Sequence, residues 1–131
     1  MFASASASGS LSFTLRAGGS NNSTSNYHNA VYSYRSGNAA GASTANENAG
    51  GAALIANMSN IGYFEINVFN PALNSETDGS IVGNYGSGSA GYRVEAAWGA
   101  FRHSVAYQAD GFHLGFGGTT YGTVAVYGYK K

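Results

Sequence analysis

Alternation of apolar and polar residues is the feature that most restricts the fold of this chain. The segment LSFTLR (11–16) places Leu11, Phe13 and Leu15 on one side of an extended backbone, and 63–69 alternates in the same way. Successive side chains of a strand point to opposite faces, so each segment has one face to bury. Apolar positions three and four apart never persist for three turns, because Gly or Asn interrupts them. The sequence therefore predicts strands and no long helix.

About eight segments alternate in this manner. They lie at 11–16, 29–35, 63–69, 80–85, 92–98, 103–109, 111–116 and 122–129. Turn clusters rich in Gly, Asn and Ser separate them, and Pro71 falls in such a cluster, where it removes no ladder hydrogen bond. We predict an all-β chain that folds as an antiparallel, jelly-roll-like β-sandwich.

Two segments lack a clear period. Residues 36–54 are low in complexity, and we predict a long surface loop at about 36–54. Residues 1–10 are expected to form a flexible N-terminal arm. The rest, 11–131, is expected to be a single β-sandwich domain, because 131 residues are enough for one hydrophobic core.

Charge is scarce and balanced in this chain. Six Lys and Arg match six Asp and Glu, and only 9% of residues are charged, where about 25% is ordinary. Without clustered cations, no nucleic acid partner is expected. Without a run of ~20 apolar residues, no membrane insertion is expected. A neutral chain lacks long-range repulsion between copies, so we expect a homo-oligomer. The absence of cysteine excludes disulfides and thiolate metal sites.

Two motifs imitate ligand sites. GSGSAG (86–91) has the G-x-G-x-x-G spacing of a nucleotide-binding loop, but a strand-like segment follows it instead of a helix, which favours a hairpin loop. Asn74, Glu76 and Asp78 imitate the first half of a calcium loop, but Tyr85 stands where that loop needs a bidentate glutamate. A polar turn is favoured over a calcium site. We expect no metal and no cofactor.

Catalytic patterns are also weak. His28, His103 and His113 have no recognised ligand spacing, so we interpret them as hydrogen-bonded wall residues of strands instead of zinc ligands. The chain has no G-x-S-x-G elbow, and its acids occur too singly to form an acid–base pair. We expect a protein that is not an enzyme and has no catalytic residue.

Exposed tyrosines are the recognition chemistry that remains. A flat ring beside amide side chains can stack on a sugar and hydrogen-bond its hydroxyls. The candidates for glycan contact are Tyr27, Tyr32, Tyr34, Tyr107 and Tyr121. The alternative is that tyrosines fill the core of a leucine-poor chain and pack across strands.

The C-terminal stretch TTYGTVAVYGYKK resembles the closing strand of a β-sandwich domain found in bacteriophage virion proteins. The motif residues are Gly122, Thr123, Val126, Tyr127 and Gly128. Upstream, GYFEINVFNP is similar to a second segment of that family. As a closing strand, the stretch is expected to point Val124 and Val126 toward the core, so that Val126→Asp unfolds the domain.

The resemblance implies a non-enzymatic structural protein of the virion, displayed on the particle surface. Within that reading the chain is a capsid decoration (cement) or tail-associated subunit, with a homotrimer as the expected assembly and other capsid or tail proteins as partners. One alternative is a tail-fibre receptor-binding module that recognises host glycans, and another is a free carbohydrate-binding lectin. Members of the family usually have one or two strands before the segment at 11–16, so an open sheet edge is expected here.

Overall fold

A computed structural model of the chain describes residues 2–6, 9–35, 42–58, 61–87, 93–117 and 121–128. These residues form the strands β1 (Phe2–Ser6), β2 (Gly9–Ala17), β3 (Ser20–Asn21), β4 (Tyr27–Arg35), β5 (Ala42–Ala49), β6 (Ala52–Met58), β7 (Ile61–Phe69), β8 (Thr77–Ser87), β9 (Arg93–His103), β10 (Gly111–Phe116) and β11 (Tyr121–Ala125). Across these ranges, no helix long and apolar enough to cross a membrane is found.

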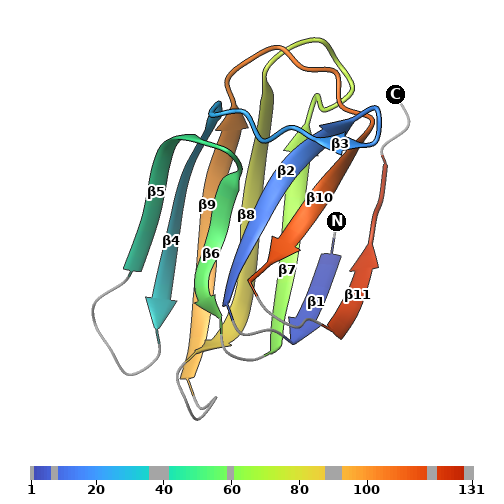
Figure 1. The fold of residues 1–131 in the computed structure, drawn as a ribbon. Helices are drawn as coiled ribbons and strands as arrows, with labels where there is room; N and C mark the ends of the chain where they lie inside the picture. The colour runs from blue at the N-terminus through green and yellow to red at the C-terminus, as the bar shows by residue number, and fades with distance from the viewer. Residues whose placement is uncertain are drawn as a thin grey trace.

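The strands form two antiparallel sheets that pack face to face as a β-sandwich (Figure 1). The large sheet has seven strands in the order β11-β1-β7-β8-β9-β4-β5. In the four-stranded small sheet, β2 pairs with β10 along one edge and with β6 and β3 along the other. Figure 1 shows β2, β6 and β10 in front of the large sheet, whereas β1 and β11 form its right-hand edge. The predicted all-β, antiparallel sandwich is confirmed.

Alternation along the strands produces a core between the two sheets. Leu11, Phe13 and Leu15 of β2 are fully buried, as the sequence predicted. The large sheet contributes buried side chains from β4, β7, β8 and β9, which include Val31, Phe64, Ile66, Ile81 and Phe101. The rings of Phe13 and Phe101 have centroids 4.8 Å apart. Each large side chain buried in this way stabilises the fold by about 1.5–3 kcal/mol.

Two glycines of β8 allow aromatic rings to lie against the large sheet. A Cβ on Gly79 would overlap the ring of Phe101, and a Cβ on Gly83 would overlap the ring of Phe64. Each ring comes from the residue directly opposite on a neighbouring strand. Glycine inside a strand often marks such a close approach. The rings therefore fill space that a second side chain would need, which is how aromatic residues build the core of a leucine-poor chain.

The first two and the last two strands form one long ribbon that passes from one sheet to the other. β1 pairs with β11 in the large sheet, and β2 pairs with β10 in the small sheet. Gly9 begins β2 with a φ of 137°, and a Cβ there would lie 2.9 Å from the Cα of Gly117. Bends where strands switch sheets make the corners of sandwich folds. Gly9 and Gly117 thus form a corner where two backbones are in contact.

Two buried side chains of β4 tie the large sheet to the small one. The amide Nδ2 of Asn29 donates to the carbonyl oxygen of Ala53 at 2.8 Å, and its Oδ1 accepts from the Ala53 N–H at 3.2 Å. The Tyr27 hydroxyl accepts a hydrogen bond from the Leu15 N–H at 2.8 Å. These side chains form the hydrogen bonds that a neighbouring strand would otherwise provide, because they satisfy backbone groups of β6 and β2.

Residues 42–58, many of which fall in the loop predicted at about 36–54, instead form β5 and β6. β5 is an edge strand of the large sheet and consists of small and polar residues, so it shows no apolar alternation. In β6, the pairing with β2 shifts register next to Leu11, and the consecutive residues Leu54 and Ile55 are both buried. A bulge of this kind breaks the two-residue period. Residues 36–41 of the predicted loop lie outside the described residues.

The N-terminal arm predicted at 1–10 includes a strand. β1, at residues 2–6, lies between β7 and β11 in the large sheet, with Phe2 opposite both Glu65 and Ala125. After Phe2, the segment alternates between Ala and Ser. It joins the sheet through backbone pairing, and it lacks the large apolar residues by which a strand is recognised in a sequence. The chain itself thus places a strand ahead of β2, and the edges of the large sheet are β5 and β11.

The strand predicted at 103–109 does not form. His103 is the last residue of β9, and residues 104–110 are irregular. The Ala109 N–H donates to the carbonyl oxygen of Pro71 at 2.7 Å, and the Tyr107 N–H donates to that of Ser75 at 3.3 Å. The segment is therefore held by the turn that follows β7, although its side chains alternate in the sequence.

The C-terminal strand is shorter and less buried than predicted. β11 ends at Ala125, and Val124, Val126 and Tyr127 are 47%, 62% and 66% exposed. The register places Val124 in the same row as Phe64, on the inward face of the large sheet. However, β10 is the last described strand of the small sheet on this side and does not cover β11. The prediction that Val124 and Val126 reach the core is wrong for that reason.

Candidate functional site on the outer face of the large sheet

Six large apolar side chains are exposed in three adjacent rows of the outward face of the large sheet; a seventh, Phe69 of β7, lies apart from them, opposite Asp78. They come from β4, β7, β8 and β9, and each is at least 41% exposed. We call this set the aromatic face; it consists of Tyr32, Tyr34, Tyr63, Val82, Val94 and Trp98. Single exposed apolar residues are ordinary, whereas a contiguous exposed patch marks a contact surface.

Cross-strand register brings these side chains into neighbouring rows. Tyr32 lies opposite Trp98, and Trp98 lies opposite Val82. The next outward row consists of Tyr34, Ala96, Asn84 and Tyr63. The rings of Tyr32 and Trp98 have centroids 5.0 Å apart and an interplanar angle of 48°. Because paired strands lie ~4.8 Å apart, Tyr32, Trp98 and Val82 form an apolar row across three strands, and the same row ends at Glu65 of β7.

The alternation that builds the core also produces this face. In β9, Ala97 and Phe101 are buried, so Trp98 points outward together with Ala96 and Ala100. The alanines are short, and the Trp98 ring therefore stands above its neighbours along the strand. A raised, exposed ring can stack against another flat surface, and the tyrosine hydroxyls can form hydrogen bonds at its margin.

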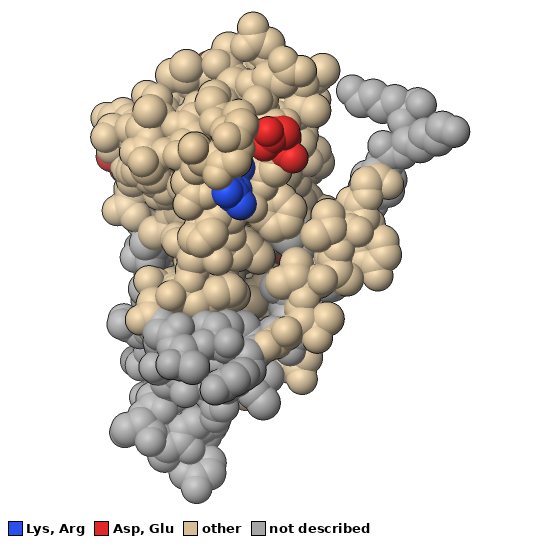
Figure 2. All heavy atoms as spheres, turned by 45° about the vertical axis from the view of Figure 1, so that its right-hand side comes forward, with Lys and Arg blue, Asp and Glu red and all other residues tan. Residues whose placement is uncertain are grey.

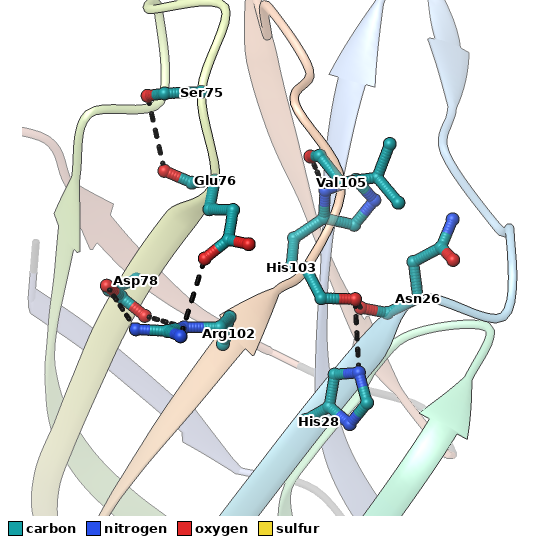
Figure 3. Close-up of polar contacts among 9 residues, drawn as sticks. Asn26, His28, Ser75, Glu76, Asp78, Arg102, His103 and Val105 are labelled. Carbon is teal, nitrogen blue, oxygen red and sulfur yellow. Dashed lines mark hydrogen bonds and ion pairs between the residues drawn. The ribbon is translucent and has the colours of Figure 1, made fainter.

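An ion-pair cluster lies on the same outward face, where β8 begins and β9 ends (Figure 3). The Arg102 guanidinium donates to both carboxylate oxygens of Asp78, at 2.7 and 3.1 Å, and lies 3.4 Å from Oε2 of Glu76. These bonds lower the pKa of Asp78 and raise that of Arg102. Two acids of the motif considered for calcium, Glu76 and Asp78, are therefore paired with Arg102. Within the described residues, no group of three His, Asp or Glu side chains could hold a metal ion.

His28 and Ser104 form a second polar contact (Figure 3). Nε2 of His28 lies 3.1 Å from the Ser104 hydroxyl oxygen, and that hydroxyl donates to the carbonyl oxygen of Asn26 at 3.2 Å. Since the hydroxyl has one proton, Nε2 of His28 is the donor to Ser104. The histidine therefore does not act as a base toward this serine. The contact connects β4 to the segment after β9.

His103 is buried between the sheets, away from the aromatic face. Its Nδ1 donates to the Val105 carbonyl oxygen at 2.9 Å, so Nε2 accepts from the Asn22 amide at 3.1 Å. Its ring lies 4.8 Å from the Tyr27 ring. Burial lowers the pKa of His103. His113 lies elsewhere, 3.4 Å from the Thr14 hydroxyl, so the sandwich does not bring the three histidines together.

The sequence-predicted tyrosine candidates have different positions in the fold. Tyr32 and Tyr34 lie two residues apart on β4 and belong to the aromatic face. Tyr27 is fully buried and bonded to β2, so it cannot contact a glycan. Tyr107 is partly buried against the core. Tyr121 begins β11, and its side chain lies outside the described part of the structure.

Trp98 and Tyr63 are members of the face that the candidate set did not include. Both occupy positions that alternate with buried residues, since Ala97 precedes Trp98 and Phe64 follows Tyr63. That parity is visible in the sequence. What the sequence does not show is the strand order, which places β4 beside β9 and so puts Tyr32 next to Trp98.

Comparison of the chain with known protein families, curated protein sequences and solved structures found no match.

Proposed function

We propose that this protein is a non-enzymatic structural subunit displayed on the surface of a bacteriophage virion, as a capsid decoration or tail-associated protein. The observation that carries the proposal is the aromatic face, a group of exposed aromatic and aliphatic side chains on four neighbouring strands. Such a surface is suited to permanent contact with another protein. The virion setting is supported by the resemblance of the C-terminal stretch that contains Gly122, Val126 and Tyr127.

The low charge of the chain is consistent with assembly. Its formal net charge is zero, and on the side of β10 and β11 the described surface carries few charged side chains (Figure 2). Neutral surfaces bring no long-range repulsion to a crowded particle lattice. We propose a homo-oligomer in contact with other capsid or tail proteins, and the trimer implied by the resemblance stays a prediction.

The proposal is tested by locating the protein in particles and by changing the face. Mass spectrometry and imaging of purified particles of the phage that carries the gene should detect it on the particle surface. Particles that lack the protein should take up the wild-type chain but not Trp98→Lys. Val105→Lys is the matched control, because Val105 is equally exposed but lies in the segment after β9. Particles without the protein would refute the proposal.

A second candidate function is glycan recognition, as a receptor-binding module or a free lectin. The exposed rings of Tyr32, Tyr34, Tyr63 and Trp98 favour it, because pyranose rings stack on flat aromatic surfaces. On a glycan array, binding that disappears in Trp98→Ala and persists in Val105→Ala would support this function.

A further inference from the structure

We propose that the aromatic face binds a second copy of this chain, so that two large sheets pack face to face. This inference rests on the proposed role of the face as a contact surface and names its partner. Charged residues are rare on the face: among the described outward positions of β4, β7, β8 and β9, Glu65, Asp78 and Arg102 carry charge, and the latter two are bonded to each other. Glu47 is exposed on the edge strand β5. Aromatic enrichment with loss of charge is typical of interface centres.

The outward surface of the whole large sheet, of which the aromatic face is a part, has the size that a pair of copies needs. Along β9, the outward positions from Val94 to Arg102 span about eight residue steps, or about 26 Å at ~3.3 Å per step. Across the sheet, seven strands spaced ~4.8 Å apart span about 29 Å. The product is about 760 Å², close to the ~800 Å² that each partner contributes to a stable interface. Face-to-face packing thus requires no further surface.

The aliphatic members of the face favour a protein partner over a sugar. Val82 lies directly opposite Trp98, and Val94 lies on the same strand as Trp98. Valine has no ring on which a sugar can stack, but it gains free energy when apolar protein surface covers it. A second copy is the partner that the net charge of zero supports, since two identical neutral surfaces do not repel each other.

Such an interface is isologous, which means that the same residues contribute from both copies. Its assembly is a pair with two-fold symmetry. A three-fold ring would need two different surfaces that meet head to tail. The mass of the assembly therefore distinguishes face-to-face packing from the trimer implied by the sequence resemblance.

Sedimentation equilibrium of wild type, Trp98→Lys, Val82→Lys and Val105→Lys tests the pair. We expect twice the mass of one chain for wild type and for Val105→Lys. Loss of an interface hot spot weakens binding about 30-fold or more, and because the change occurs on both copies, Trp98→Lys should weaken the pair about 1,000-fold. Circular dichroism should show folded strands in all four proteins. A wild-type monomer at about 100 μM, a mass of three copies, or an intact Trp98→Lys dimer would overturn the inference.

Site-directed cross-linking provides a measurement that does not depend on the lysine variants. The chain contains no cysteine, so a single introduced cysteine reports one position. Ala96→Cys, in the centre of the face, should cross-link two copies through a short bis-maleimide, whereas Ala106→Cys, exposed outside the face, should not. Equal yields would overturn the pair. A monomer that still enters particles would refute this inference and leave the proposed function intact, and a dimer absent from particles would do the reverse.

Discussion

The substitution Tyr27→Phe removes one oxygen atom from the interior of the sandwich. The hydroxyl of Tyr27 accepts the N–H of Leu15 at 2.8 Å, and both residues are almost completely buried. The position along β2 explains why this bond exists. Pairing of β2 with β6 ends at Phe13, and pairing with β3 begins at Arg16. The Tyr27 hydroxyl satisfies the N–H in the gap between these two partners.

The cost of losing this acceptor follows from burial. Phenylalanine keeps the ring and leaves the Leu15 N–H without its acceptor in a site that water does not reach, which costs about 1–3 kcal/mol. For a chain of this length, 1 kcal/mol lowers the melting temperature by about 3–5 °C. We therefore expect Tyr27→Phe to melt about 3–15 °C below wild type. Burial also raises the pKa of Tyr27, as expected for a shielded hydroxyl.

Thermal melting and urea unfolding, both followed by circular dichroism, measure this effect. Tyr34→Phe is the matched control, because it removes the same atom from a side chain on the exposed face. It should change the free energy of unfolding by less than about 0.5 kcal/mol. The urea slope should be unchanged in both variants, since neither alters the surface exposed on unfolding. Equal stability of the two variants would refute the assignment of Tyr27 as a structural acceptor.

Three further predictions follow from the packing. Val126→Asp should change the free energy of unfolding by less than about 0.5 kcal/mol, because Val126 is mostly exposed; a loss of folding would show that β11 is covered. Gly79→Ala should destabilise the fold by about 1–3 kcal/mol, because the new Cβ overlaps the ring of Phe101. Gly111→Ala, whose Cβ has room, should not destabilise it, and the midpoints of urea unfolding compare the two variants. Burial lowers the pKa of His103, so below pH ~6.5 the unfolded chain binds a proton that the folded chain excludes. Stability should be constant above that pH and fall below it, and His103→Gln should show a weaker fall.

Strands with one buried face were predictable from the sequence. β2, β7 and β10 lie where alternation placed them, because their inward positions carry Leu, Ile or Phe, which are buried in β2 and β7 and partly buried against the core in β10. β1 and β5 were not predictable, because both are held by backbone pairing and their Ala, Ser and Asn residues resemble those of a loop. In β6, the shift in register put Leu54 and Ile55 in the core together and removed the period.

The sequence predicted that exposed tyrosines form the candidate site, but it did not predict which residues lie beside them. Tyr32 and Tyr34 were recognised as exposed tyrosines, whereas Tyr27 is buried, because it lies an odd number of residues from them on β4 and so points to the inward face with Asn29 and Val31. The association of Tyr32 with Trp98 depends on β4 pairing with β9 across about 60 intervening residues. Local periodicity shows which face a side chain takes, but pairing between distant strands decides what stands beside it.

The ribbon that joins the ends of the chain has a consequence for biosynthesis. Among the strands, β1 and β2 leave the ribosome before the others, and their partners β10 and β11 leave it after the others. Until β10 and β11 have emerged, both early strands lack one neighbour, and the Gly9–Gly117 corner cannot close. A nascent chain in this state exposes unpaired strand edges, which favours association between incomplete chains. In a cell-free translation reaction, native protease resistance should therefore arise only after β11 has left the ribosome.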